Sequence, residues 1–287
     1  MKVIRPAIKW SGSKRSQAPL ILEHFPKKIK TYYEPFVGGA SVLRYLLESD
    51  IKVDNFICSD INKDLISLWN NIKLCPAIVT EHYKKLWIEM KDIGLGINKK
   101  KYYFNVRERF NENKSPLDFM FLTRTCFNGL SRYNKSGNFN ASLHPNRDGI
   151  RPETLGKILN EWSMLINEKN VSFLYSHYGK ITSEQNDFLY LDPPYANTKG
   201  MYYGQIGYDS FWDWLQEQKG NWALSFDGKA KDKDMTFDVP KDLYSGHFYL
   251  CSGNSSFRRL IKTSNDSIVY ESLYTSIKGD FYYDKQK

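Results

Sequence analysis

The pattern of apolar and polar residues along the chain alternates between short apolar runs and amphipathic segments. Short runs rich in β-branched and aromatic residues predict strands, and apolar residues spaced three and four apart predict helices. Strands are expected at 31–33, 55–59, 171–175, 188–191, 222–226, 248–251 and 267–274, and helices at 16–25, 42–47, 61–72, 154–166 and 210–218. Strands that alternate with helices predict an α/β fold with an open sheet.

The middle of the chain has a different pattern, which predicts helices without strands. Residues 77–92, 99–112 and 116–127 each have helical spacing of apolar residues. We therefore predict an inserted, mostly helical module at 67–154 that recognises the substrate. The catalytic domain would then consist of 1–66 and 155–287.

A β-hairpin is expected near the end of this module. The pair Ser136-Gly137 is a turn signal, and alternating Arg132, Tyr133, Phe139 and Asn140 flank it. A projecting loop with polar side chains and a Phe-Asn pair suits insertion into a DNA groove. The hairpin is therefore a candidate for substrate recognition.

Candidate chemistry is most concentrated at 188–195, which reads Phe-Leu-Tyr-Leu-Asp-Pro-Pro-Tyr. The prolines end the predicted strand, so Asp192 lies at its carboxyl end, where open α/β sheets bind ligands. Because proline has no N–H, Pro193 offers a carbonyl acceptor without a competing donor. Asp192 and Pro193 could accept both N–H groups of a nucleobase amine while Tyr195 stacks on the base. Taken alone, these residues are equally an ordinary turn.

Two further segments predict a nucleotide site. A glycine turn at 34–41 separates a strand from a helix, and glycines let backbone approach a ligand closely. Since the full GxGxxG pattern is absent, a single adenosine-containing ligand is favoured over NAD. Asp60 ends the next strand and is expected to bind ribose hydroxyls or to cap the following helix. Lys14, in a turn before a helix, could hold an anion such as a carboxylate, or be an ordinary surface lysine. The loop 196–208 is expected to close over a bound base.

The charge and aromatic content favour a nucleic-acid partner. The chain has 287 residues, a net charge of +9 and 15% aromatic residues, and this combination suits phosphate neutralisation and base stacking. Arg258 and Arg259 lie in a basic loop that could contact phosphate, although such loops are often only solvated.

Metal binding and membrane association are not expected. The four cysteines form no CxxC pair, and no two of the five histidines have i, i+4 spacing. The amino terminus lacks a signal-peptide pattern, and no stretch is apolar enough to span a membrane. We therefore expect a metal-independent cytoplasmic protein.

Taken in order, the motifs resemble those of the Dam-like DNA adenine methyltransferases. They are Lys9-Trp10-x-Gly12-x-Lys14, Glu34-Pro35-Phe36-Val37-Gly38-Gly39, Asp60, Asn128-Gly129-Leu130-x-Arg132 and Asp192-Pro193-Pro194-Tyr195, and the resemblance extends from Ile8 to about Tyr274. It implies a Rossmann-like methyltransferase sheet that transfers a methyl group from S-adenosylmethionine (SAM) to N6 of a flipped adenine in duplex DNA. This is the reaction of a site-specific DNA-methyltransferase (adenine-specific).

The resemblance also implies roles for individual residues. Trp10 and Lys14 would contact the methionine part of SAM, Phe36 and Gly38 would line its pocket, and Asp60 would bind the ribose. Asp192 would contact the cofactor and, with Tyr195, hold the target adenine. Lys9 and Arg132 match positions that touch guanines, and Phe127 and Asn128 match those that fill the gap left by the extruded base. Leu130 and Asn140 belong to the same expected DNA-contacting segment. A restriction endonuclease that acts separately is a further expected partner, unless the enzyme is solitary or phage-borne.

Three departures from the family pattern limit these implications. His177-Tyr178 stand where several relatives have Asp-Phe, whose acid meets the adenine amine of SAM; Tyr178 can still stack on the cofactor. Ala141-Ser142 replace the Val-Pro of relatives that methylate GATC, so GATC is not implied, and the carboxy-terminal loop lacks their glycine-rich form. The alternatives are a catalytically silent DNA-binding protein of this fold, or a methyltransferase of RNA or of a protein amide; Asp192 and the hairpin favour DNA.

Overall fold

The computed structural model of the protein describes residues 4–94, 96–194, 206–230, 233–254 and 268–278. In chain order the elements are α1 (Ala18–Leu22), β1 (Lys28–Glu34), α2 (Ser41–Leu47), β2 (Lys52–Asp60), α3 (Lys63–Leu74), α4 (Pro76–Asp92), α5 (Ile97–Asn113), α6 (Pro116–Thr125), η1 (Phe127–Gly129), α7 (Pro152–Glu168), β3 (Ser172–Tyr175), η2 (Tyr178–Lys180), β4 (Phe188–Leu191), α8 (Tyr208–Gln216), β5 (Asn221–Ala230), β6 (Lys233–Asp234), β7 (Gly246–Asn254) and β8 (Ile268–Thr275). The predicted strands and helices all overlap these elements. The short strand β6 was not predicted.

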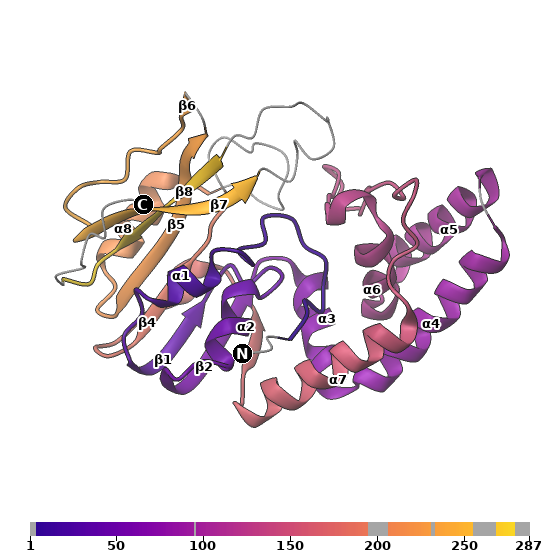
Figure 1. Cartoon of the computed structure of the whole chain (residues 1–287), viewed down its shortest axis with the longest axis horizontal. Coiled ribbons are helices and arrows are strands. Elements are labelled where there is room, and N and C mark those ends of the chain that lie inside the picture. Colours follow the sequence, from indigo (N-terminus) through magenta and orange to yellow (C-terminus); the bar gives the residue numbers. More distant parts are fainter. Residues whose placement is uncertain (1–3, 95, 195–205, 231–232, 255–267, 279–287) are drawn as a thin grey trace.

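The strands form one sheet in the order β3-β2-β1-β4-β5-β8-β7, with β6 paired to β5 (Figure 1). The strands from β3 to β5 are parallel, whereas β8 and β7 are antiparallel to their neighbours. Helices connect β1 to β2, β2 to β3 and β4 to β5, whereas only the short η2 lies between β3 and β4. The predicted Rossmann-like α/β fold is confirmed.

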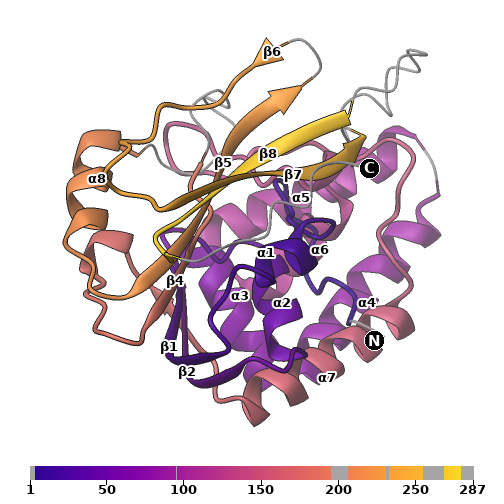
Figure 2. The same ribbon diagram turned by 60° about the vertical axis from the view of Figure 1, so that its left-hand side comes forward.

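Side chains of β4 show how the sheet is covered on both faces. Phe188 and Tyr190 belong to a core cluster that contains residues of α1, α2, α3 and α7. Leu189 and Leu191 belong to a second cluster with residues of α8. Because successive strand residues point to opposite faces, a strand buried on both faces is apolar throughout. Figure 2 shows α8 on the side of the sheet away from α1 and α2.

The carboxyl ends of the parallel strands lie along one edge of the sheet. In the register of neighbouring strands Glu34 pairs with Cys58, Asp60 with Tyr175, and Leu191 with Leu224. The segments that follow β1, β2, β3 and β4 therefore begin side by side. This is the edge at which α/β sheets bind ligands.

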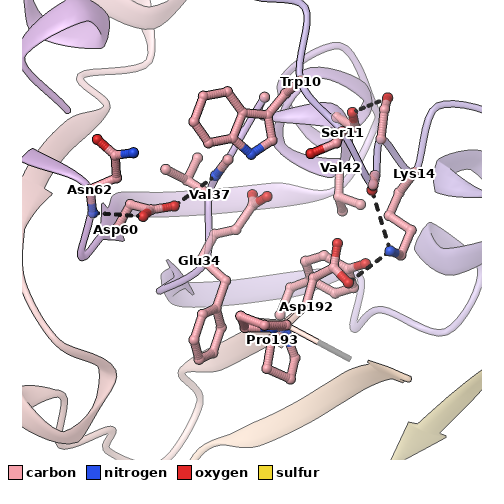
Figure 3. Close-up of a pocket in the computed structure, with 18 of the residues that line it drawn as sticks. Trp10, Ser11, Lys14, Glu34, Val37, Val42, Asp60, Asn62, Asp192 and Pro193 are labelled. Carbon is pink, nitrogen blue, oxygen red and sulfur yellow. Dashed lines mark hydrogen bonds and ion pairs between the residues drawn. The ribbon is translucent and has the colours of Figure 1, made fainter. Parts of the chain in front are cut away.

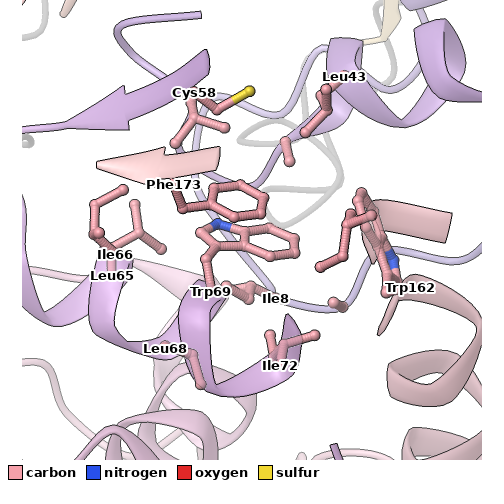
Figure 4. Packing of buried hydrophobic residues seen from close by; sticks show 14 of the residues in the cluster. Ile8, Leu43, Cys58, Leu65, Ile66, Leu68, Trp69, Ile72, Trp162 and Phe173 are labelled. Carbon is pink, nitrogen blue, oxygen red and sulfur yellow. The ribbon is translucent and has the colours of Figure 1, made fainter. Parts of the chain in front are cut away.

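The helices α4, α5 and α6 lie to one side of the sheet, and α7 leads back to it (Figure 1). Trp69 of α3 stacks on Phe173 of β3 at 5.2 Å between ring centroids, and it lies 5.0 Å from Trp162 of α7 (Figure 4). Both helices therefore share one core with the sheet. Helix α3 continues through residue 67, so the division into 67–154 and the rest of the chain stays a prediction.

The predicted hairpin is present in a short form. Tyr133 and Phe139 form an isolated antiparallel bridge, and the N–H of Asn140 donates to the Arg132 carbonyl at 2.8 Å. The expectation that the Phe-Asn pair of the hairpin inserts into a DNA groove was wrong for Phe139, which is only 1% exposed. It packs against Phe110 and Phe119, each at 5.9 Å between centroids, and so anchors the hairpin to the helices.

Candidate functional site

A cavity of about 270 Å³ opens at the carboxyl ends of β1, β2, β3 and β4. Phe36, Asp60 and Asp192, predicted from three separate motifs, all line it. In Figure 3, Asp60 lies on one side of the cavity and Asp192 on the other, with Trp10 and Glu34 between them. The sequence motifs therefore converge on a single site.

The glycine turn after β1 is shaped by Trp10. A Cβ on Gly38 would lie 3.1 Å from indole atoms of Trp10, and one on Gly39 would lie 2.9 Å from its Cβ. Gly38 also has φ of +46°, which glycine adopts without strain. Trp69 donates its indole N–H to the Gly38 carbonyl at 3.0 Å. The turn is therefore fixed from both sides, with its backbone exposed to the cavity.

Asp60 is held at the end of β2 by backbone donors. The N–H of Gly38 donates to its Oδ2 at 3.2 Å, and the N–H of Asn62 donates to its Oδ1 at 2.9 Å. Burial raises the pKa of Asp60 to about 6, although these hydrogen bonds oppose the shift. Each carboxylate oxygen has a second lone pair, so Asp60 can still accept from a pair of ligand hydroxyls.

Asn62 carries a buried donor that has no partner among the described residues. Its Oδ1 caps α3 by accepting from the N–H of Leu65 at 3.0 Å, but its Nδ2 makes no hydrogen bond. The residue is 2% exposed and lines the cavity beside Asp60 (Figure 3). A buried donor left unpaired costs about 1–3 kcal/mol, so its position fits a ligand that supplies an acceptor. No sequence motif pointed to Asn62.

Lys14 and Asp192 are joined at the opposite side of the cavity. The Lys14 ammonium lies 2.8 Å from Oδ1 of Asp192 and 3.4 Å from Oε2 of Glu271, and its side chain is 5% exposed. It also donates to the Gly12 carbonyl at 3.4 Å. Glu271 is on β8, far along the chain and outside any motif, so no local pattern pointed to it.

Glu34 lies between the two sides and is fully buried. Tyr32 donates its hydroxyl to Oε2 of Glu34 at 2.8 Å. Burial, opposed by this hydrogen bond and reinforced by the charge of Asp192, raises the pKa of Glu34 to about 8. The carboxyl therefore carries a proton at neutral pH and can donate as well as accept.

His177 and Tyr178 line the cavity beyond Asp60. Tyr178 packs against Phe36 at 5.6 Å and against Trp214 at 5.0 Å between centroids. Nδ1 of His177 accepts from the N–H of Gly179 at 3.2 Å. A neutral histidine that accepts at Nδ1 carries its proton on Nε2, so this ring offers a donor where an aspartate would offer acceptors.

The residues predicted to contact DNA do not line the cofactor cavity but lie around Lys9 and the hairpin. A Cβ on Gly129 would come within 2.8 Å of Cγ of Lys9, so Lys9 packs against the base of the hairpin. Phe127 is 39% exposed and stacks on His144 at 5.3 Å, whereas Asn128 has a left-handed φ of 53°. The guanidinium of Arg132 donates through Nε to Oδ1 of Asn140 at 3.0 Å, and Leu130 is partly exposed beside them.

Some predicted site residues lie outside the described residues. They are Tyr195, most of the loop 196–208, and Arg258 with Arg259. Among the described residues, no group of three or more His, Cys, Asp or Glu side chains could hold a metal ion. No helix in the described part of the chain is both long and apolar enough to cross a membrane.

Comparison with known proteins gives a consistent family. Residues 10–268 match the model of D12 class N6 adenine-specific DNA methyltransferases. The chain is 36% identical over 215 residues to the Type II methyltransferase M.MjaIII of Methanocaldococcus jannaschii, covering 67% of this chain and 69% of that protein. It is 32% identical over 202 residues to the DNA adenine methylase of Vibrio cholerae, covering 68% and 67%. It is 27% identical over 252 residues to the Type II methyltransferase M.CviBI of Paramecium bursaria Chlorella virus NC1A, covering 86% and 88%.

Proposed function

The chain belongs to the D12 class N6 adenine-specific DNA methyltransferase family, and from this premise we propose that it transfers the methyl group of SAM to N6 of an adenine flipped out of duplex DNA. One observation carries the proposal: Asp192 lines the same cavity as Phe36, the glycine turn and Asp60. A target amine held at Asp192 would therefore face a donor bound along the glycine turn. Separate cavities would not allow direct transfer.

The order of the strands supports one orientation of the cofactor. Along the sheet edge, His177 follows β3, Asp60 ends β2, Gly38 follows β1 and Asp192 follows β4. The adenine, ribose and sulfonium of SAM follow one another in the same order. We therefore assign the adenine to His177 and Tyr178, the ribose to Asp60, and the sulfonium to Gly38. The methionine part would lie against Phe36, Trp10 and Lys14.

The cofactor fits donors and acceptors of this chain. Asp60 has lone pairs for the ribose hydroxyls, and the unpaired Nδ2 of Asn62 and the Nε2–H of His177 suit ring nitrogens of adenine, which are acceptors. When bound, SAM supplies a methyl group that its sulfonium makes electrophilic.

Activation of the target amine is assigned to Asp192 and Pro193. Their oxygens would accept both N–H groups of adenine N6, which localises its lone pair toward the methyl group. Asp192 need not be a strong base, because the amine becomes acidic only once it is methylated. Tyr195 would stack on the flipped base.

Recognition of DNA is assigned to the hairpin and to Lys9. We assign the gap left by the flipped base to Phe127 and Asn128, and base contacts to Lys9 and Arg132. Leu130 and Asn140 would support the same contact. The exposure of Phe127 and the packing of Lys9 against Gly129 support this arrangement. Because two of the relatives are Type II methyltransferases, a separate restriction endonuclease with the same site is a further proposed partner.

The proposal is tested by incubating purified protein with tritiated SAM and plasmid DNA. We expect label in DNA, and long-read sequencing of the plasmid should locate N6-methyladenine within one short sequence. Binding to DNA without incorporation would support the silent DNA-binding alternative. Label in RNA or protein, offered in parallel reactions, with none in DNA would overturn the substrate assignment.

A further inference from the structure

A second cavity, of about 560 Å³, adjoins the one described above. The two share Trp10, Ser13, Gly39 and Ser41, so the amino-terminal segment and the glycine turn border both. Ser13 and Ser41 are hydrogen-bonded to each other through their hydroxyls at 2.8 Å. The cofactor proposal uses none of the remaining residues of this second cavity.

The second cavity is strongly basic. Arg5, Lys9, Arg15 and Arg124 line it, and none of the described residues around it carries a carboxylate. We call it the basic cavity. Within the described part of the chain, no salt bridge joins any of these four side chains to an acidic residue. Its positive charge is therefore not compensated by the protein, as far as the chain is described.

Two of these basic side chains, Arg124 and Lys9, are partly buried. The Arg124 guanidinium donates to the carbonyls of Pro6, at 2.6 Å, and Ala7. Burial lowers the pKa of Arg124 to about 10, so it stays charged at neutral pH. Burial also lowers the pKa of Lys9, and the charges of Arg147 and Arg124 lower it further. Like charges held together without a counter-ion favour an anionic ligand.

Phosphate oxygens fit the other polar groups of the basic cavity. Of the paired Ser13 and Ser41 hydroxyls one donates to the other, which leaves one O–H to donate to an oxygen acceptor. Thr154 also lines the cavity, from the first turn of α7, and its hydroxyl is a further donor. Arginine and hydroxyl donors of this kind bind the phosphates of nucleic acids.

The position of the basic cavity selects the source of the phosphate. Lys9 lines it and also packs against Gly129, next to the hairpin residues assigned to the DNA. Arg147, which lies in the segment after the hairpin, is close enough to Lys9 to influence its charge. We propose that the basic cavity holds a backbone phosphate of the bound DNA, with Arg5 and Arg15 as its exposed donors. This inference rests on the proposed function for the identity of the partner.

The test replaces the exposed donors without changing the cofactor site. Arg5→Gln with Arg15→Gln is compared with Lys28→Gln plus Lys52→Gln, which removes the same charge. Lys28 and Lys52 are exposed and pair at the first positions of β1 and β2, at the opposite edge of the sheet. Binding to a short fluorescent duplex of random sequence is measured by anisotropy between about 50 and 200 mM salt.

We expect the slope of log K against log salt to fall in magnitude by about 0.9 for each phosphate that the arginine variant no longer neutralises. The lysine variant should keep the wild-type slope, and both should bind SAM as wild type does. An unchanged slope in the arginine variant, or an equal change in both variants, would overturn the proposal. Calorimetry with inorganic phosphate that detects binding while the DNA slope is unchanged would also overturn it, because the site would then serve a free anion.

The outcome is separable from that of the proposed function. Wild-type protein that methylates plasmid, with an unchanged salt slope in the arginine variant, refutes the basic cavity alone. Protein that never methylates DNA, with the expected change in slope, refutes the enzyme assignment and leaves the phosphate site supported.

Discussion

Two buried carboxyl groups of the cofactor cavity, Glu34 and Asp60, differ from those of the helical part of the chain, although Lys14 and Asp192 form an ion pair elsewhere in the cavity. In the helices, Asp118 accepts two hydrogen bonds from Arg109, at 2.6 and 2.7 Å, and one from His82 at 2.7 Å. Burial opposes its ionisation, but these partners hold the pKa of Asp118 below its ordinary value. In the cavity, burial raises the pKa values of Glu34 and Asp60, which receive hydrogen bonds but no salt bridge from a described cation.

A second charged cluster, where a loop residue meets α4 and α5, follows the same rule. Asp148 accepts from Lys91, at 3.1 Å, and from Lys99, and these two lysines overcome burial to lower its pKa. By contrast, Asn62 in the cavity has a buried donor with no described partner. Charges paired within the protein fix its structure, whereas the unpaired donor of Asn62 lines a cavity and is available to a ligand. The comparison predicts that variants in the two regions fail in different ways.

The largest effect is expected at the catalytic carboxylate. Asp192→Ala should lower methyl transfer by at least about 10³-fold, or about 4 kcal/mol, because the amine loses its main acceptor. SAM affinity, measured by calorimetry, should change far less, because Glu271 still pairs with Lys14 after the substitution. Asp213→Ala, at an exposed position on α8, is the matched control. Turnover close to wild type in a tritiated-SAM assay would remove Asp192 from the chemistry.

The next effect is expected on stability rather than activity. Asp118→Asn should lower the free energy of unfolding by about 2 kcal/mol, because a neutral amide replaces the buried carboxylate that accepts from Arg109 and His82. Urea unfolding measures the loss, with the exposed Glu112→Gln as control. SAM affinity of the folded variant should match wild type. If Asp118→Asn weakened SAM binding with no loss of stability, the contrast between the two regions would fail.

The same variant also tests how the free energy of unfolding depends on pH. The pKa of Asp118 is lower in the folded protein than in the unfolded chain, so its contribution is complete above the unfolded value and is lost as pH falls through the folded value. Wild type should therefore lose this contribution only in acid, below about pH 4. The variant has no such contribution to lose. The free energies of unfolding of wild type and variant should therefore become similar below about pH 4.

A smaller effect is expected on cofactor affinity at Asp60. The pKa of Asp60 is raised to about 6, so below that pH the group is protonated and accepts ribose hydroxyls less well. SAM affinity should fall as pH drops through 6, by up to about tenfold per pH unit, and level off above 7. Asp60→Asn should weaken binding at pH 7.5 by about tenfold or more and flatten this dependence. A wild-type profile that is flat across pH 6 would contradict the ribose assignment.

Local patterns were sufficient to predict the fold and several of the residues that line the cofactor cavity. The apolar run of β4, the glycines at 38 and 39, and Asp60 each carry their signal within a few neighbouring residues. Such residues are set by strand and turn geometry, which a sequence encodes locally. For that reason the α/β fold was predicted correctly, and the glycine turn, Asp60 and Asp192 were each expected where a strand ends.

Contacts between distant segments could not be predicted in the same way. Glu271 reaches Lys14 only because β8 pairs with β5 at the far side of the sheet. Phe139 was expected on a projecting loop, but the packing of the helices buries it. The basic cavity likewise joins Arg5 and Arg124, which are far apart in the chain. These features depend on tertiary packing, for which short motifs carry no signal.

The smallest expected effect tests the unpaired donors at the adenine end. Asn62 Nδ2 lies beside Asp60, nearest the ribose, and so suits N3 of adenine, while Nε2–H of His177 suits N1. Removing one neutral hydrogen bond costs about 0.5–1.5 kcal/mol, or roughly 2- to 10-fold in affinity. S-adenosylhomocysteine analogues with carbon in place of N1 or N3 should bind that much more weakly to wild type by calorimetry.

Pairing analogue with variant identifies which side chain reads which nitrogen. His177→Ala should lose the penalty for the 1-deaza analogue alone, and Asn62→Ala the penalty for the 3-deaza analogue alone, as in a double-mutant cycle. An analogue lacking the 6-amino group should bind wild type nearly as well as the parent, since neither donor uses that amine. His177→Asp supplies acceptors instead of a donor. This variant should therefore bind the parent compound, which has the 6-amino group, more tightly than the analogue that lacks it. If wild type already discriminated strongly against the deaminated analogue while tolerating both deaza analogues, the cavity would recognise the amine, and its unpaired donors would serve another purpose.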